Sequence, residues 1–239
     1  MPIHEHYETG APCWVDYGAL DPMGARAFYG ELFGWTFRTP DPHADAGADM
    51  GAGGSAGGYA FIELAGQVVG GFGRVPPGLP AAWNTYLATE DAGAVAVRVR
   101  ALGGRVVFGP VAAGHDGRLL FAIDPAGAAV GFWEGHRPAG VVLVDEPGTW
   151  CGHELWSGDP AFYGALFGAD GATPPDGLPG TAARSVPTSG VGAQWVTFFM
   201  TRDSVATVQA AVRLEATIVA RRRHATIMRD PWGALLALA

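Results

Sequence analysis

An eight-residue word that occurs twice places the strongest constraint on this chain. Residues 27–34 read AFYGELFG and residues 161–168 read AFYGALFG, so seven of the eight positions agree at an offset of 134 residues. In the first word Phe28, Leu32 and Phe33 fall on one stripe of a helix, the pattern of a helix with one buried face. We therefore predict an internal duplication in which each copy carries the same short helix.

Start and stop signals for a helix flank both words. An Asp-Pro pair begins at Asp21 and again at Asp159, which places a capping aspartate before a proline at the first helical position. Each word ends in a glycine, the residue that most often follows the end of a helix. These signals predict helices over residues 22–34 and 160–167.

The segments around these helices repeat one plan, in which a strand and a helix are followed by three further strands. A second capping aspartate in each copy, Asp91 and Asp203, starts another helix, over residues 91–102 and 203–214. The expected strands lie at residues 13–17, 35–37, 59–64, 67–75, 83–88, 105–108, 119–123 and 129–133, and then at residues 149–156, 194–200, 217–220, 224–228 and 234–238. The third unit, which begins at residue 149, spans fewer residues than the first, so we expect it to have lost or shortened strands. We predict an α+β fold with a first domain over residues 1–135, a linker over 136–147 and a shortened second domain over 148–239.

The charge and the composition argue against several classes of partner. The chain has 15 Lys and Arg residues and a formal net charge of −8, which disfavours nucleic acid and anionic membrane surfaces. No apolar run approaches the ~18 residues of a membrane span, and the N-terminus lacks the regions of a signal peptide. The two cysteines, Cys13 and Cys151, make no disulfide framework. We expect a cytoplasmic protein without nucleic-acid or membrane partners, and we leave a homodimer open.

The four units, the repeated Phe-Tyr-Gly-x-Leu-Phe-Gly helix and an Asp-Pro-x-Gly turn before a closing strand, at Asp124 and Asp230, resemble the vicinal oxygen chelate superfamily. This superfamily contains glyoxalases, bleomycin resistance proteins and extradiol dioxygenases. The resemblance covers nearly the whole chain and is closest to two-copy glyoxalase-like proteins. It implies two glyoxalase-like domains built from tandem βαβββ units, with curved mixed sheets and helices outside. It leaves the activity open, because the superfamily includes metal-dependent enzymes as well as metal-free proteins that sequester drugs.

The same resemblance implies where metal ligands would lie. They fall seven residues before each capping aspartate and seven residues after the aspartate of each Asp-Pro-x-Gly turn. These positions hold Trp14, Asn84 and Gly131 in the first copy and Gly152, Val196 and Ala237 in the second. A divalent ion needs several His, Cys, Asp or Glu donors, so we expect no metal and no cofactor. A metal-dependent glyoxalase or dioxygenase stays open if a shift in register brings in Asp16, Glu134, His153 or Glu154.

Strand alternation predicts which side chains share the face of those positions. In the first copy they are Trp14, Asp16, Asn84, Tyr86 and Trp133, and in the second copy they include Glu154, Trp156 and Phe198. Aromatic walls with a few polar groups are typical of small-molecule sites, although the rings are equally compatible with core packing. Asp16 is either a general base or one half of a structural pair with a residue such as Arg26.

We therefore predict a metal-independent enzyme that acts on a hydrophobic conjugated metabolite by isomerase, cyclase or lyase chemistry. Trp14, Tyr86 and Trp133 would hold the substrate, Asp16 would transfer a proton, and Asn84 or Tyr86 would polarise an oxygen. Further contacts are expected from Glu154, Trp156 and Phe198. The alternative is a binding protein that sequesters an antibiotic or a pathway intermediate without turnover.

Overall fold

Four units, each of which begins with a strand and a helix, build the molecule. The computed structural model describes residues 6–40, 58–113, 116–136, 139–156, 159–167, 181–182 and 192–239. The first copy contains β1 (Pro12–Ala19), α1 (Pro22–Phe33), β2 (Thr36–Arg38), β3 (Ala60–Leu64), β4 (Gln67–Arg74), β5 (Ala82–Ala88), α2 (Ala92–Ala101), β6 (Arg105–Ala113), β7 (Gly117–Ile123) and β8 (Ala129–Gly135). The second contains β9 (Trp150–Trp156), α3 (Pro160–Phe167), β10 (Thr181–Ala182), β11 (Gln194–Phe199), α4 (Ser204–Arg213), β12 (Thr217–Arg221), β13 (Thr226–Arg229) and β14 (Leu235–Leu238).

The helix starts follow the capping signals. The Asp21 carboxylate accepts a hydrogen bond from the Gly24 amide, and Gly34 ends α1 in the left-handed conformation with a φ of 74°. Asp91 and Asp203 cap α2 and α4 in the same way, because each accepts from the amide three residues further on. The glycine that was expected to end α3, Gly168, lies outside the described residues.

The strands form two curved mixed sheets, one for each copy. The first has the order β2-β3-β4-β1-β5-β8-β7-β6, and the second has the order β10-β9-β11-β14-β13-β12. In each sheet the first strands of its two units pair antiparallel, β1 with β5 and β9 with β11. Between α3 and β11 the described residues contribute only the two-residue strand β10, where a complete unit has three strands. The α+β prediction is therefore confirmed.

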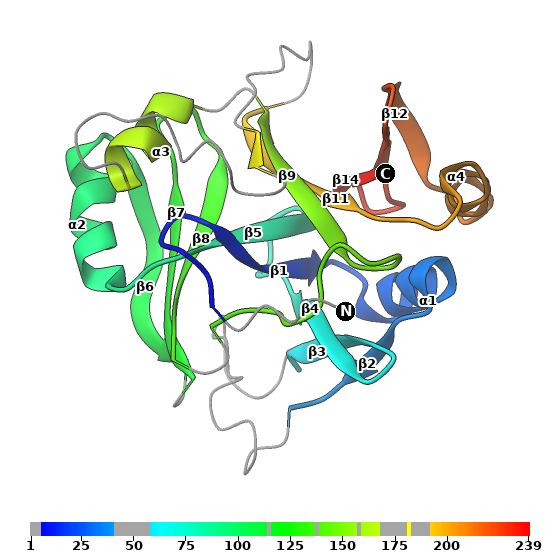
Figure 1. Ribbon diagram of the computed structural model, residues 1–239, viewed down its shortest axis with the longest axis horizontal. Coiled ribbons are helices and arrows are strands. Elements are labelled where there is room, and N and C mark those ends of the chain that lie inside the picture. Colours follow the sequence, from blue (N-terminus) through cyan, green and yellow to red (C-terminus); the bar gives the residue numbers. More distant parts are fainter. Residues whose placement is uncertain are drawn as a thin grey trace.

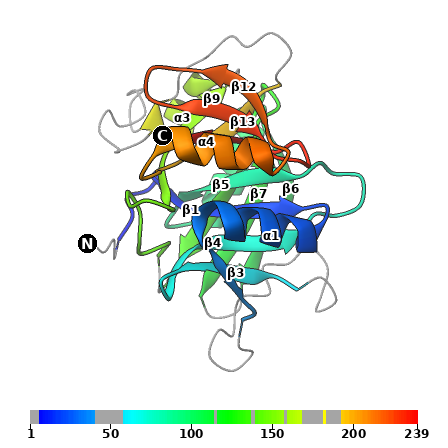
Figure 2. The same cartoon turned by 90° about the vertical axis from the view of Figure 1, so that its right-hand side faces the viewer.

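The two copies pack through their helices as well as through their sheets. Helix α1 lies beside α4 and helix α2 lies beside α3, at opposite ends of the molecule (Figure 1). Figure 2 shows α1 and α4 side by side. Strand β5 of the first sheet contacts β11 and β14 of the second, so the centres of the two sheets face each other.

Reciprocal hydrogen bonds connect each repeated helix to the opposite copy. The hydroxyl of Tyr29, from the first word, donates to Asp230 in the closing turn of the second copy at 2.9 Å. The hydroxyl of Tyr163, from the second word, donates to Asp124 in the closing turn of the first copy at 3.2 Å. Each of these hydroxyls also accepts from a tryptophan of its own copy, Trp83 or Trp195.

A buried histidine lies where the sheets meet. His153 is 1% exposed, and its Nδ1 lies 3.1 Å from the Thr85 hydroxyl of the first copy and 3.5 Å from that of Thr197. Its Nε2 is buried and has no hydrogen-bond partner among the described residues. Burial lowers the pKa of His153 to about 3, so the ring is neutral at physiological pH.

We expect this histidine to make the fold sensitive to acid. Because its folded-state pKa lies below the ordinary value, its contribution to stability is present above ~6.5 and is lost as the pH falls toward 3. One proton of difference corresponds to at most ~1.4 kcal/mol per pH unit. Urea unfolding between pH 7 and pH 4 should show a shallower decline for His153→Gln than for the wild type. Parallel declines for the two proteins would refute the assignment.

Candidate active site

Asp16 lies at the centre of one face of the first sheet, which we call the Asp16 face. Its Oδ1 accepts a hydrogen bond from Asn84 Nδ2 at 2.7 Å, and its Oδ2 accepts one from the Tyr86 hydroxyl at 2.6 Å. These three side chains meet because Asp16 pairs with Asn84 across β1 and β5, and Tyr86 follows two positions later on the same face. The three residues that were predicted to carry the chemistry are therefore in direct contact.

The carboxyl group of Asp16 is buried without a countercharge. It is 7% exposed, and no described cation lies within ion-pair distance of it. Burial raises the pKa of Asp16, and the hydrogen bonds from Tyr86 and Asn84 offset only part of that increase. Arg26, the structural partner considered for Asp16, places its guanidinium over the rings of Phe37 and Phe72.

A second phenol, Tyr59, lies beside Asp16 and was not among the predicted site residues. Its ring covers Gly71 and Gly73 of β4, and its hydroxyl accepts a hydrogen bond from Trp14 Nε1 at 3.2 Å. Gly71 is the direct partner of Asp16 in the parallel pair of β1 and β4. The signal in the sequence is the pair Gly71 and Gly73 in β4, two residues apart, which leaves room for a ring on the face that Asp16 shares.

Two half-buried phenylalanines extend the Asp16 face on either side of the carboxyl group. Phe61 of β3 pairs with Gly71, and Phe121 of β7 pairs with Gly131. Trp14 contacts Phe61 edge to face, and Tyr86 contacts Phe121 in the same manner. The face therefore offers aromatic surface next to a buried acid.

The aromatic rings that were predicted to stack on a ligand are more deeply buried than the wall of an open site would be. Trp14 and Trp133 are each 8% exposed, and Tyr86 is 5% exposed. The Trp133 ring folds over Gly135, where an added Cβ atom would lie 2.4 Å from the indole nitrogen. Their roles as ligand contacts stay predictions, and Phe61 and Phe121 present more of their surface.

The positions that the family resemblance implies for metal ligands do not fit a metal in the first copy. Trp14 offers no donor for a metal ion, and Asn84 donates its amide to Asp16. At Gly131 a Cβ atom would lie 2.0 Å from the ring of Tyr86, so that ring occupies the space where a ligand side chain would begin. One amide oxygen and one carboxylate do not make a divalent-ion site.

The corresponding face of the second sheet is packed with apolar side chains. Val196 and Ala237, two of the implied ligand positions, are fully buried in a cluster with Trp156, Ile227 and Leu235. Trp156 has no exposed surface, and Phe198 packs against the same cluster. The Glu154 carboxylate accepts from the Trp156 indole and pairs with Arg222. Glu154, Trp156 and Phe198 thus belong to a filled face, and their expected contacts with a ligand stay predictions.

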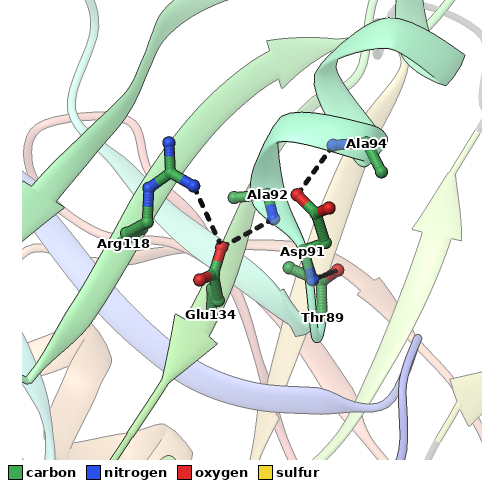
Figure 3. A network of polar contacts seen from close by, with 6 residues as sticks. All are labelled: Thr89, Asp91, Ala92, Ala94, Arg118 and Glu134. Carbon is green, nitrogen blue, oxygen red and sulfur yellow. Dashed lines mark hydrogen bonds and ion pairs between the residues drawn. The ribbon is translucent and has the colours of Figure 1, made fainter.

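The remaining acidic candidate, Glu134, binds the N-terminal turn of helix α2 and does not contribute to the Asp16 face. Figure 3 shows its Oε2 accepting from the Ala92 amide at 2.8 Å, in the first turn of α2, with Arg118 3.7 Å away. Asp91 caps the same turn through the Ala94 amide at 2.9 Å. Within the described residues no three His, Cys, Asp or Glu side chains group as a metal site.

The two sheets and their paired units define a glyoxalase-like protein of the vicinal oxygen chelate fold. Two solved structures share it at low sequence identity. The Mn(II)-bound glyoxalase from Novosphingobium aromaticivorans gives a TM-score of 0.56 at 15% identity, over 96% of this chain and 81% of that one. The 2,3-dioxygenase LapB from Pseudomonas sp. KL28 gives a TM-score of 0.60 at 12% identity, over 97% of this chain and 93% of that one. At these identities the likeness shows the fold alone.

Sequence relatives give the finer placement. The chain is 32% identical to "Putative glyoxylase CFP32" of Mycobacterium tuberculosis (strain CDC 1551 / Oshkosh), over 100% of this chain and 97% of that protein. It is 33% identical to the anthracycline biosynthesis protein DauV of Streptomyces sp. (strain C5), over 95% of this chain and 92% of that protein. The chain therefore belongs to the vicinal oxygen chelate superfamily, and CFP32 and DauV are among its relatives in sequence. No family model matches it. Among the described helices none is both long and apolar enough to cross a membrane.

Proposed function

We propose that this protein is a metal-independent enzyme that rearranges a flat, oxygenated aromatic metabolite of the polyketide type. The single observation that carries the proposal is the buried Asp16 carboxyl, held by Asn84 and Tyr86 and without a countercharge among the described residues. A buried, unpaired acid beside aromatic side chains is more typical of a functional site than of a stabilising core. The relatives DauV and DnrV, both named for anthracycline biosynthesis, support the choice of substrate class.

Asp16 would act as the base that moves a proton. Each of its carboxylate oxygens accepts one hydrogen bond and keeps a second lone pair, which can take a proton from an acidic C–H or O–H of the substrate. Burial raises the pKa of Asp16 toward the working pH, which favours both the uptake of the proton and its return. Isomerisation, cyclisation and elimination need only such a transfer, so no redox partner is required.

A direct test uses protein freed of metal. Chelator-treated protein, shown to be metal-free by elemental analysis, would be incubated with hydroxyanthraquinone polyketides while products are followed by absorbance and mass. We expect conversion without loss or gain of mass for an isomerase, and no increase when Mn²⁺, Zn²⁺, Ni²⁺ or Fe²⁺ is added. Activity that appears only with a metal would contradict the proposal.

The second candidate is a protein that binds such a metabolite and releases it unchanged. One observation favours it: each Asp16 oxygen already has a donor within the protein, so the carboxyl group is held in place without a substrate. Tight binding across the same panel without any product would support this candidate over the enzyme.

A further inference from the structure

Among the described residues the hydroxyl of Tyr59 accepts a hydrogen bond but donates none. Its oxygen accepts from Trp14 Nε1 at 3.2 Å, and its own proton has no acceptor among the described residues. The Asp16 carboxylate is close, but among the described residues its hydrogen bonds come from Asn84 and Tyr86 and not from Tyr59. A half-buried phenol that keeps a free proton beside a buried acid has the properties of a donor to a guest molecule.

The position of this hydroxyl is fixed by the absence of side chains beneath it. A Cβ atom at Gly71 would lie 1.7 Å from the Tyr59 oxygen and 3.0 Å from the Asp16 Cβ atom. A Cβ atom at Gly73 would lie 3.3 Å from the same ring. Two glycines in one strand thus seat the ring against the sheet, directly beside the carboxyl group.

The surroundings also favour donation over ionisation. Burial and the nearby Asp16 carboxylate raise the pKa of Tyr59 well above its ordinary value, so the phenol keeps its proton. The indole N–H that Trp14 donates to the phenol oxygen polarises the O–H bond, which strengthens the hydrogen bond that Tyr59 can give.

We propose that Tyr59 donates a hydrogen bond to a carbonyl or quinone oxygen of the ligand and thereby orients the ring next to Asp16. This inference rests on the proposed function, because it names the contact that positions the same substrate class. It makes Tyr59 a specificity residue, which separates oxygenated rings from hydrocarbon rings of equal size. A site that donates to a ligand oxygen discriminates against analogues that lack it.

The test compares two probes of the same ring outline, the hydroxyquinone quinizarin and the hydrocarbon anthracene, by quenching of tryptophan fluorescence. We expect wild type to prefer quinizarin, and Tyr59→Phe to weaken quinizarin about five- to tenfold while anthracene is unaffected. The matched control is Tyr7→Phe, which removes a phenol that donates to the Val141 carbonyl outside the Asp16 face. It should leave both affinities unchanged.

A second variant distinguishes this contact from a general loosening of the site. Gly71 does not have a positive φ, so alanine is compatible with its backbone, yet the added methyl group would collide with the Tyr59 hydroxyl and the ring carbon that carries it, so the ring must move. Gly71→Ala should therefore weaken quinizarin as Tyr59→Phe does, and the double variant should lose little more than either one.

The outcomes separate the two ideas. If wild type binds quinizarin and Tyr59→Phe binds it equally well, the role of Tyr59 is refuted while the proposed function stands. Equal losses for both probes would also refute it, since Tyr59 would then act by packing. If wild type binds neither probe, the substrate class fails and this inference fails with it.

Discussion

Replacement of Asp16 by asparagine is expected to lower turnover by about 10²- to 10⁴-fold, the usual contribution of a positioned general base. Asparagine keeps an oxygen that can accept from Asn84, and its amide can donate to the Tyr86 oxygen, so the shape of the site is retained. Affinity for a hydroxyanthraquinone should hence change little. The measurement is the initial rate on a substrate found in the metal-free assay, together with the dissociation constant of the same compound.

Stability provides the internal control for this variant. Because burial raises the pKa of Asp16, the stabilisation that it gives is present below its unfolded-state pKa and is lost as the pH rises through the folded-state pKa. At neutral pH the variant should therefore melt at the same temperature as wild type or above it. Asp203→Asn, at the exposed cap of α4, provides a carboxylate control that should retain turnover. Asp16→Asn with full turnover would show that Asp16 is not the base and would contradict the role proposed for it.

Replacement of Asp230 by alanine is expected to lower the free energy of unfolding by about 4 kcal/mol. Its Oδ2 accepts from the hydroxyls of Tyr17 and Tyr29, and its Oδ1 accepts from the amides of Trp232 and Ala234. The side chain is 4% exposed, so its removal leaves four donors without a partner in the interior. Urea unfolding of wild type and variant measures the difference.

The internal repeat supplies a matched comparison. Asp124 holds two amides of its own turn in the same way, but among the described residues it accepts from one tyrosine, Tyr163. Asp124→Ala should therefore cost about 1 kcal/mol less than Asp230→Ala. If Asp230→Ala proved no more destabilising than the loss of an exposed cap at Asp203, the reciprocal bonds would not hold the two copies together.

The sequence was sufficient to predict much of the fold, because its signals are local. Each Asp-Pro pair indicates where a helix begins, and the glycine that ends each repeated eight-residue word indicates where it stops. Helix α1 accordingly runs from Pro22 to Phe33. The end of strand β6 was harder to predict from the sequence. It runs to Ala113, beyond the expected end at residue 108, because pairing with β7 extends past the local apolar pattern. The proposed domain limits stay predictions.

Alternation of side chains along a strand predicted the part of the site that lies on β1 and β5, and it could not predict residues contributed by other segments. Asp16, Asn84 and Tyr86 share a face because β1 and β5 are antiparallel, and alternation within each strand indicated that face. Tyr59 was missed because its place depends on which glycines of β4 lie opposite β1. The burial of Trp14 could not be predicted either, since the ring that contacts it, Phe61, comes from a strand two places away in the sheet.

The contact between Gly131 and Tyr86 has a consequence for the engineering of this face. A glutamate or histidine introduced at residue 131 would collide with the phenol ring before it could reach an ion. Building a metal centre there therefore requires that the Tyr86 ring be removed first, and that step breaks a hydrogen bond to Asp16. A substitution at residue 131 alone therefore cannot add a metal ligand to the Asp16 face while Tyr86 keeps its present place.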